Sequence, residues 1–306
     1  MKILFFGTPE FAVGTLDRIM RDGKHEVVGV VTAPDKPAGR GHAPKMSEVK
    51  IYALEHGLKL LQPEKLKDQE FIDEVRGLNA DVFVVVAFRM LPEVVWQMPE
   101  KGTFNVHASL LPRYRGAAPI NWAIINGEER TGVTTFMLRH DIDTGPVLSQ
   151  REIEIGPDEN VGSVYDRLMK AGAELAVETL DKLAEGTEKQ IAQSELEGEV
   201  CGAPKLNPDN CTIDWSKSAK EVHNLVRGLA PYPGARTTLR FENGAKMSAK
   251  ILETRLPKCD SRNGGNLTVE CGDGNRIEIL ELQPAGKKRM RAEDYLRGLH
   301  DKVTFE

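Results

Sequence analysis

Two polar side chains stand two residues apart in an apolar, strand-like run. Asn105 and His107 alternate with Phe104, Val106 and Ala108 in FNVHASLLPRYRG, which continues into a turn-rich Pro-Arg-x-Arg-Gly stretch. Residues i and i+2 of a strand point to the same face, so the amide and the imidazole should project side by side. They are either a core pair that satisfies its own hydrogen bonds or two groups of a functional site.

A second candidate is the segment RHDIDTGP, in which Asp141 and Asp143 precede Thr144 and Gly145. Such aspartates often cap a turn, but a tight backbone can also hold a carboxylate so that it points into a crevice. In open parallel sheets, ligands bind beyond the carboxyl ends of the strands. We therefore expect residues 88–92, 105–112 and 139–146, which follow three predicted strands, to converge on one crevice.

The surrounding segments predict the sheet that would position these residues. Asp81–Phe88 shows no polar alternation, which is typical of a strand buried on both faces. Strands alternate with helices along the first part of the chain, and this order predicts an α/β fold with a doubly wound, mostly parallel, Rossmann-like sheet. The other strands are expected at Lys2–Gly7, His25–Thr32, Gly102–Ser109, Thr131–Arg139 and Val147–Ile155.

The composition changes after Gly186, and 306 residues favour two domains over one. We expect a first domain at 1–188, a polar linker at 189–206 and a second domain at 207–306. Trp215–Leu229 has the pattern of one helix. The short strands and Gly or Asn turns that follow it predict a smaller, OB-like β-barrel.

Bulk composition describes a globular protein, with 40% hydrophobic and 28% charged residues. No apolar run approaches the ~20 residues of a membrane helix, and the initial apolar stretch breaks at Gly7 and Pro9, so we expect a cytoplasmic protein with no membrane partner. No H-E-x-x-H or C-x-x-C motif occurs, and we expect no metal site. The cysteines are Cys201, Cys211, Cys259 and Cys271.

The net charge of -5 is unevenly distributed. Residues 205–306 contain 18 Lys and Arg against 14 Asp and Glu, whereas residues 1–204 contain 23 against 32. A basic part beside an acidic part is either surface variation or a contact with a polyanion. The turn after the first strand, FFGTPEF, lacks G-x-G-x-x-G, which disfavours an NAD-linked dehydrogenase on the same fold.

The motif N-x-H-x-S-L-L-P, followed by D-x-D-T-G, resembles the folate-dependent formyltransferase family. GTPEFA near the start and DKPAGRG in the first long loop make the whole chain similar to the tRNA-formylating members of that family. The resemblance implies transfer of a formyl group from 10-formyltetrahydrofolate to the α-amino group of methionyl initiator tRNA.

The resemblance assigns catalysis to Asn105, His107 and Asp143. Attack of an amine on the formyl carbon develops negative charge on its oxygen, and donors from Asn105 and His107 would stabilise that charge. Asp143 is expected to be hydrogen-bonded near His107, where its charge would help to pass the proton of the amine away, directly or through water.

Folate contacts are also implied by the resemblance. Ser109 is expected to belong to the folate loop and not to act as a nucleophile. Arg89 stands where many relatives have glycine, and it either closes on the pterin pocket or extends into solvent; Tyr114 replaces tryptophan, and Pro146 follows Gly145 where aspartate is frequent. The assigned residues are Ser109, Leu110, Leu111, Pro112, Ala87, Phe88, Arg89, Met90 and Leu91.

The long loop Ala33–Lys50 is rich in basic residues. By resemblance, Lys36, Arg40 and Lys45 contact the acceptor stem of the tRNA; otherwise the loop is only a solvated basic segment. Family members with other acceptors formylate glycinamide ribonucleotide or amino sugar nucleotides, or hydrolyse formyltetrahydrofolate. The basic loop and the second domain favour tRNA, and we expect a monomer.

Overall fold

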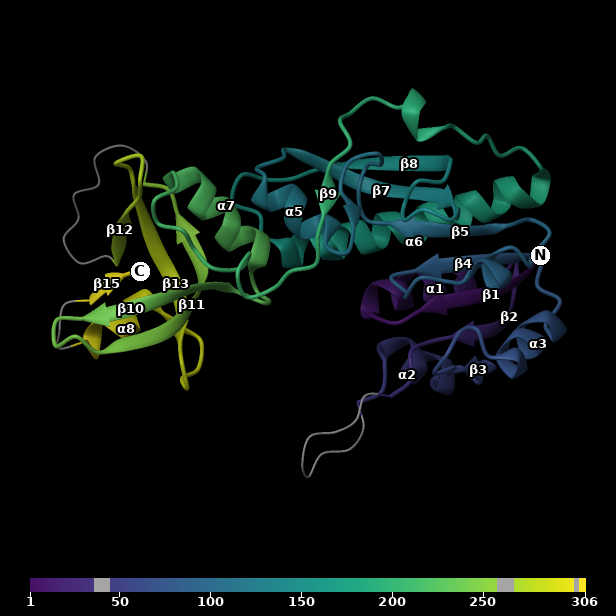
Figure 1. Cartoon of the computed structure of the whole chain (residues 1–306), viewed down its shortest axis with the longest axis horizontal. Helices are drawn as coiled ribbons and strands as arrows, with labels where there is room; N and C mark the ends of the chain where they lie inside the picture. Colours follow the sequence, from purple (N-terminus) through teal and green to yellow (C-terminus); the bar gives the residue numbers. More distant parts are fainter. Residues whose placement is uncertain (36–44, 258–266, 300–302) are drawn as a thin grey trace. The chain divides into compact units, whose positions relative to one another are not determined.

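The computed structural model describes residues 1–35, 45–257, 267–299 and 303–306 (Figure 1). It divides into two compact units. The first contains 1–115, 132–153 and 166–202, and the second contains 116–131, 154–165 and 203–306. Residues 116–131 and 154–165 thus group with the C-terminal part of the chain, and the boundaries expected at 188 and 207 stay a prediction.

The first unit is built on a seven-stranded sheet (Figure 1). Neighbouring strands from β3 to β5 pair in parallel, in the order β3-β2-β1-β4-β5, which confirms the Rossmann-like expectation. The strands of this parallel part are β1 (Lys2–Gly7), β2 (Glu26–Val31), β3 (Leu60–Leu61), β4 (Val82–Val86) and β5 (Thr103–His107).

Two further strands, β7 (Arg130–Met137) and β8 (Val147–Glu154), complete the order beyond β5. β7 pairs with β5 in antiparallel register, so the sheet is mostly and not wholly parallel, as expected. The intervening helix α5 (Pro119–Ile125) groups with the second unit and does not act as a crossover helix on this sheet.

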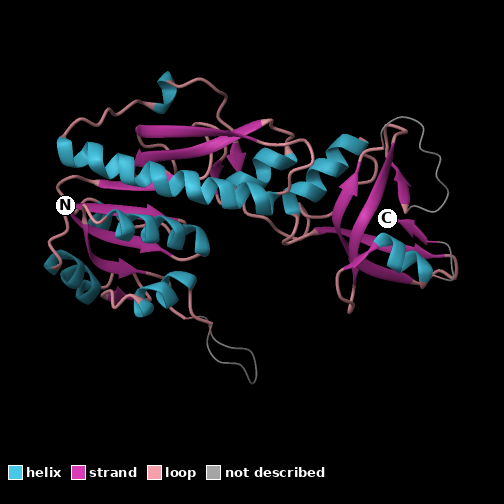
Figure 2. Cartoon of the chain, turned by 180° about the vertical axis from the view of Figure 1, so that it is seen from behind, coloured by secondary structure: helices cyan, strands magenta, loops and turns pink. Residues whose placement is uncertain are grey.

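Helices cover both faces of the parallel strands, which explains why all five residues of β4 are buried. One face carries α1 (Glu10–Asp22) and α6 (Val161–Glu185) (Figure 2). There, Phe11 and Val106 pack against Gly172 of α6. The opposite face carries α3 (Gln69–Gly77) and α4 (Glu93–Trp96), whose apolar residues share a core with Phe6, Phe83 and Val85.

Local signals set several helix ends. Gly23 adopts φ 71 at the end of α1, a conformation that suits glycine. Helix α2 (Glu48–Glu55) begins after Ser47, whose hydroxyl accepts the backbone N–H of Lys50.

In the second unit, helix α7 (Ala219–Leu229) begins four residues later than the expected start at Trp215. Ser218 and Glu221 form a capping box that starts the helix there. Asp214 accepts hydrogen bonds from the backbone and the hydroxyl of Ser216, which holds this segment in a turn instead of a helix.

The strands of the second unit form an antiparallel, nearly barrel-shaped sheet in the order β12-β13-β11-β10-β15, in agreement with the expected small β-barrel. Its core includes Val226, Leu239 and Ile251. The remaining elements are β10 (Ala235–Phe241), β11 (Lys246–Arg255), β12 (Thr268–Glu270), β13 (Arg276–Pro284), β14 (Met290–Arg291), β15 (Val303–Phe305), α8 (Ala292–Arg297), β6 (Arg115–Gly116), β9 (Gly202–Ala203) and η1 (Gln193–Glu195).

Candidate active site

Strand β5 presents Asn105 and His107 on the face that lies opposite α6. Val106, between them, packs against Gly172 of α6. The registered partner of Asn105 on β4 is Val85, which belongs to the core shared with α3 and α4. Asn105 is half-buried and His107 is 7% exposed, so both side chains lie at the edge of a core and not in free solvent.

The imidazole of His107 is fixed by two groups. Its Nε2 lies 2.9 Å from the carbonyl oxygen of Tyr114. Because a carbonyl only accepts, Nε2 must carry a proton. The ring also lies edge-on to Phe136, with the centroids 6.3 Å apart. Only Nδ1 is then left to meet a reacting group.

Asp143 lies beside that nitrogen. Its Oδ2 is 3.9 Å from Nδ1 of His107, a distance that suits an ion pair and exceeds a hydrogen bond. The side chain of Asp143 is 12% exposed, whereas that of Asp141 is 81% exposed and lies beside His140. The structure thus brings the second aspartate of D-x-D-T-G, and not the first, close to His107, but beyond the distance of the expected hydrogen bond.

The loop that carries Asp143 reaches His107 by a route different from the expected one. Because β7 is antiparallel to β5, the loop starts near the amino end of β5, where Met137 pairs with Phe104. Met137 also donates its N–H to Pro146, which closes the loop at its base. The loop then extends back along the sheet to His107, and Asp143 adopts φ 54 within it.

Positive φ values mark the loops around the site. Among the residues that the structure describes, four other than glycine have such a value, and three of them are Ala87, Tyr114 and Asp143. Each of the three lies in a loop next to β4, β5 or β7. Left-handed backbone disfavours side chains and is frequent in functional sites, where the surroundings hold it in place.

The predicted folate loop is largely an internal support. Ser109 is fully buried, and its hydroxyl donates to the carbonyl of Arg113 at 2.7 Å, which engages the group that a nucleophile would need. Leu111 is 1% exposed and packs with Phe136 and Val147. Pro112 is buried as well, whereas Leu110 is partly accessible.

The loop after β4 is more open. Met90 is 65% exposed and Ala87 is exposed, whereas Leu91 is buried and the ring of Phe88 packs on Phe6. Arg89 is exposed, and its guanidinium donates to the backbone carbonyls of residues 63 and 64.

The predicted tRNA contacts are described only in part. Lys36 and Arg40 lie outside the described residues. Lys45 has a side chain that is 78% exposed, with its Nζ 3.8 Å from a carboxylate oxygen of Glu48.

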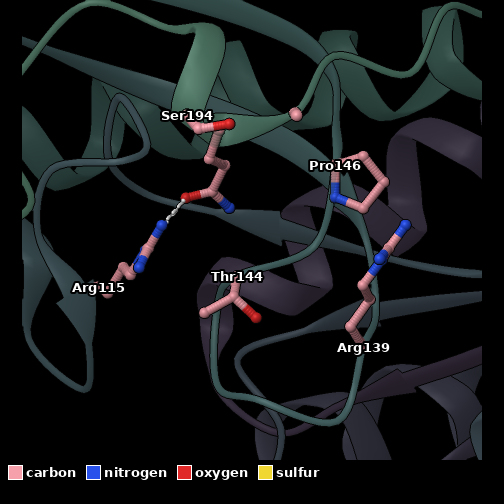
Figure 3. Close-up of a pocket in the computed structure, with 7 residues that line it drawn as sticks. Arg115, Arg139, Thr144, Pro146 and Ser194 are labelled. Carbon is pink, nitrogen blue, oxygen red and sulfur yellow. Dashed lines mark hydrogen bonds between the residues drawn. The ribbon is translucent and has the colours of Figure 1, made fainter.

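Gln193 and Arg115 were not predicted from the sequence. They line a cavity of about 300 Å³, and Arg139, Thr144 and Pro146 of the Asp143 loop line it as well (Figure 3). Within the described ranges, neither Arg115 nor Arg139 forms an ion pair. Arg115 was visible only as part of the Pro-Arg-x-Arg-Gly turn, and Gln193 stood in a polar segment with no pattern to distinguish it.

The described part of the chain contains no group of three or more His, Cys, Asp or Glu side chains arranged to hold a metal ion. It also contains no helix long and apolar enough to cross a membrane. Cys201, Cys211 and Cys271 carry free thiols, and Cys259 lies outside the described residues.

Known proteins resemble this chain in both sequence and fold. The methionyl-tRNA formyltransferase of Bacteroides fragilis is 50% identical, over 100% of this chain and 97% of the relative. That of Flavobacterium psychrophilum is 51% identical, over 98% and 96%. The solved structure of an N-formyltransferase from Helicobacter canadensis, in complex with folinic acid and dTDP-3-aminofucose, shares the fold with a TM-score of 0.64 and 20% identity, over 93% of this chain and 99% of that one.

HypX from Aquifex aeolicus, in complex with tetrahydrofolic acid, also shares the fold, with a TM-score of 0.65 and 18% identity. The match covers 100% of this chain and 50% of that one. Two family models match as well, "Formyl transferase" over residues 1–180 and "Formyl transferase, C-terminal domain" over residues 205–300. This chain therefore belongs to the formyl transferase family.

Proposed function

We propose that this chain transfers the formyl group of 10-formyltetrahydrofolate to the α-amino group of methionyl initiator tRNA. The observation that carries the proposal is the contact between His107 and Asp143 next to Asn105, in a chain half-identical over its full length to methionyl-tRNA formyltransferases. The chain matches both the formyl transferase model and the model of the C-terminal domain of that family.

The reaction needs an amine to attack the formyl carbon. The bond from the amine nitrogen to that carbon forms, the bond from the carbon to N10 of the folate breaks, and the proton lost by the amine balances the one gained by N10. A free α-amino group has a pKa of ~8, so roughly a tenth of it is already unprotonated at pH 7 and needs no strong base.

Asn105 and His107 act on the charge that develops. The amide of Asn105 donates to the oxygen of the attacked formyl group, where one donor is commonly worth ~10² to 10³ in rate. Nδ1 of His107, backed by the carboxylate of Asp143, receives the proton of the amine. Because the Nε2–H is held by Tyr114, the protonated Nδ1 is then the donor available to the oxyanion.

The loops next to these residues suit a flat, partly apolar ligand such as a reduced folate. Met90 and Ile142 are large apolar side chains that are 65% and 59% exposed, on the loop after β4 and immediately before Asp143. Binding sites for such ligands combine apolar walls with a few polar groups that fix orientation. In our proposal, residues 87–91 and 109–112 form the folate site, with Met90, Leu110 and backbone groups in contact, whereas Ser109 and Leu111 support the loop from inside.

The proposed acceptor, a tRNA, is a polyanion, and the charge distribution of this chain favours such a partner. Residues 205–306 are net basic, and Arg115 and Arg139 line the cavity beside the Asp143 loop without an ion pair among the described residues. We assign Lys36, Arg40 and Lys45 to phosphate contacts, and residues 207–306 to the acceptor arm. The enzyme acts in the cytoplasm, as a monomer.

The test is a formyl-transfer assay with matched acceptors. The protein is incubated with 10-formyltetrahydrofolate and one of three acceptors: methionyl initiator tRNA, glycinamide ribonucleotide or a dTDP-amino sugar. We expect formylation of the charged tRNA alone. Formylation of a small amine instead would replace the proposed acceptor, and release of formate without any acceptor would identify a hydrolase.

A further inference from the structure

Gln193 is a buried side chain in an otherwise exposed segment. It is 6% exposed, whereas its neighbours Ala192, Ser194 and Glu195 are exposed. The segment is held on the first unit by Ile191, which exchanges backbone hydrogen bonds of 2.8 and 2.9 Å with Val147 at the start of β8. Burial of a polar amide is unfavourable unless its hydrogen bonds are made, so the amide of Gln193 needs partners inside the protein.

All the strong hydrogen-bonding groups of this amide are engaged. Its Nε2 donates to the backbone carbonyls of Asp143 and Gly145, each at 2.8 Å. Its Oε1 accepts from Nε and Nη2 of Arg115, at 3.1 and 2.6 Å, and Figure 3 shows this contact. The orientation of the amide is unambiguous, because a carbonyl cannot donate and a guanidinium cannot accept.

The two carbonyls bracket Thr144, in the stretch that sets the direction of the Asp143 side chain. Asp143 is held at φ 54, which a residue with a side chain adopts only when its surroundings fix it. The carboxylate lies 3.9 Å from Nδ1 of His107. Fixing the carbonyls on both sides of Thr144 therefore fixes the distance between this carboxylate and the imidazole.

We propose that Gln193 is a positioning residue for formyl transfer, which acts by holding the Asp143 loop against His107. The inference rests on the proposed function. Gln193 itself contacts neither His107 nor Asn105 through any hydrogen bond within the described part of the chain, so its effect must pass through Asp143. A residue of the predicted linker thereby controls the geometry of a catalytic group.

Two substitutions separate the parts of this role. Gln193→Glu keeps the size and the acceptor for Arg115 but removes both donors and sets a carboxylate against two carbonyl oxygens. Gln193→Leu keeps the approximate volume and removes every hydrogen bond. Glu195→Gln, at an exposed position two residues away that does not line the cavity, is the control.

The test is a double-mutant cycle with Asp143→Asn, measured as single-turnover formylation of charged initiator tRNA. We expect Gln193→Glu and Gln193→Leu to lower the rate by about tenfold to a hundredfold, since a displacement of ~1 Å near the chemistry has effects of this size. KM for the folate should change by less than about twofold, because Gln193 lies outside the residues assigned to the folate site. In the Asp143→Asn background the same substitutions should have no further effect.

Three results would overturn the inference. They are an unchanged rate in both Gln193 variants, an equal loss of rate with and without Asp143, and a loss of folding in Gln193→Glu in a thermal melt, which would assign the residue to the fold instead. If Gln193→Leu alone unfolds, Gln193→Glu decides. A wild-type protein that formylates no tRNA would instead refute the proposed function, so the two failures are distinguishable.

Discussion

Gly145 gives a steric prediction for the Asp143 loop. A Cβ atom at this position would lie 1.7 Å from the carbonyl oxygen of Met137. Real Cβ contacts shorter than 3.0 Å essentially never occur, so a Gly145→Ala variant must separate the two backbones by about 1.3 Å.

The loop, and not the strand, should make this movement. Met137 ends β7 and is paired with Phe104 of the buried strand β5. The loop of Gly145 is fixed less extensively and carries Asp143 only two residues away. A displacement of about 1 Å therefore falls on the contact of 3.9 Å between Asp143 and His107, and catalysis commonly drops ~10²-fold for such a change.

The fold should survive the substitution. Forced overpacking costs about 1 to 3 kcal/mol, against a total stability of ~5 to 15 kcal/mol for a typical protein. We therefore expect a folded Gly145→Ala protein whose kcat/KM for charged initiator tRNA is about a hundredfold lower.

The assay compares initial rates of formyl-methionyl-tRNA formation with a thermal melt of the same sample. Gly77→Ala is the matched control, because a Cβ there meets no atom within 4 Å. A Gly145→Ala enzyme with kcat/KM close to the wild-type value would refute the claim that this loop must hold Asp143 in place.

Two further predictions concern a buried hydroxyl and a buried imidazole. Ser109→Ala should lower the free energy of unfolding by about 1 to 3 kcal/mol, because it removes the hydrogen bond that the fully buried Ser109 hydroxyl donates to the carbonyl of Arg113, and it should change kcat only a few-fold. Loss of nearly all activity in a folded variant would instead indicate a nucleophile. Burial lowers the pKa of His223. The carboxylate of Asp158, 3.3 Å away, raises this pKa in part, and the charge of Arg227 lowers it slightly further. Because the unfolded chain then binds the proton more readily, stability should fall as the pH drops through ~6.5, and His223→Gln should flatten this slope in urea unfolding at several pH values; equal slopes in both proteins would contradict it.

Local patterns along the sequence were enough to predict which side chains share a face of the sheet. The period of two in β5 gave the shared face of Asn105 and His107, and the apolar run Val82–Val86 gave a strand buried on both faces. The Asp-x-Asp-Thr-Gly pattern left Asp141 and Asp143 both open, and the resemblance to the family selected Asp143, the one that lies near His107. Such features depend on residues that are close together in the sequence.

Features that depend on distant contacts were missed. The antiparallel direction of β7 shows only in its pairing with β5, between residues such as Phe104 and Met137 that lie far apart in the sequence. Arg89 is tied to carbonyls at residues 63 and 64, more than twenty positions away. The partners of Gln193, the carbonyls of residues 143 and 145, lie about fifty positions away in the sequence.

The most direct test of the account is a double-mutant cycle on His107 and Asp143. Single-turnover formylation of charged initiator tRNA is measured for His107→Ala, Asp143→Asn and the double variant, with melts to confirm folding. If the two groups handle one proton together, each single change should lower the rate by roughly 10² to 10³, and the double variant should be little worse than the poorer single one. Losses that multiply in the double variant, or single variants that keep the wild-type rate, would contradict the joint role of these two side chains.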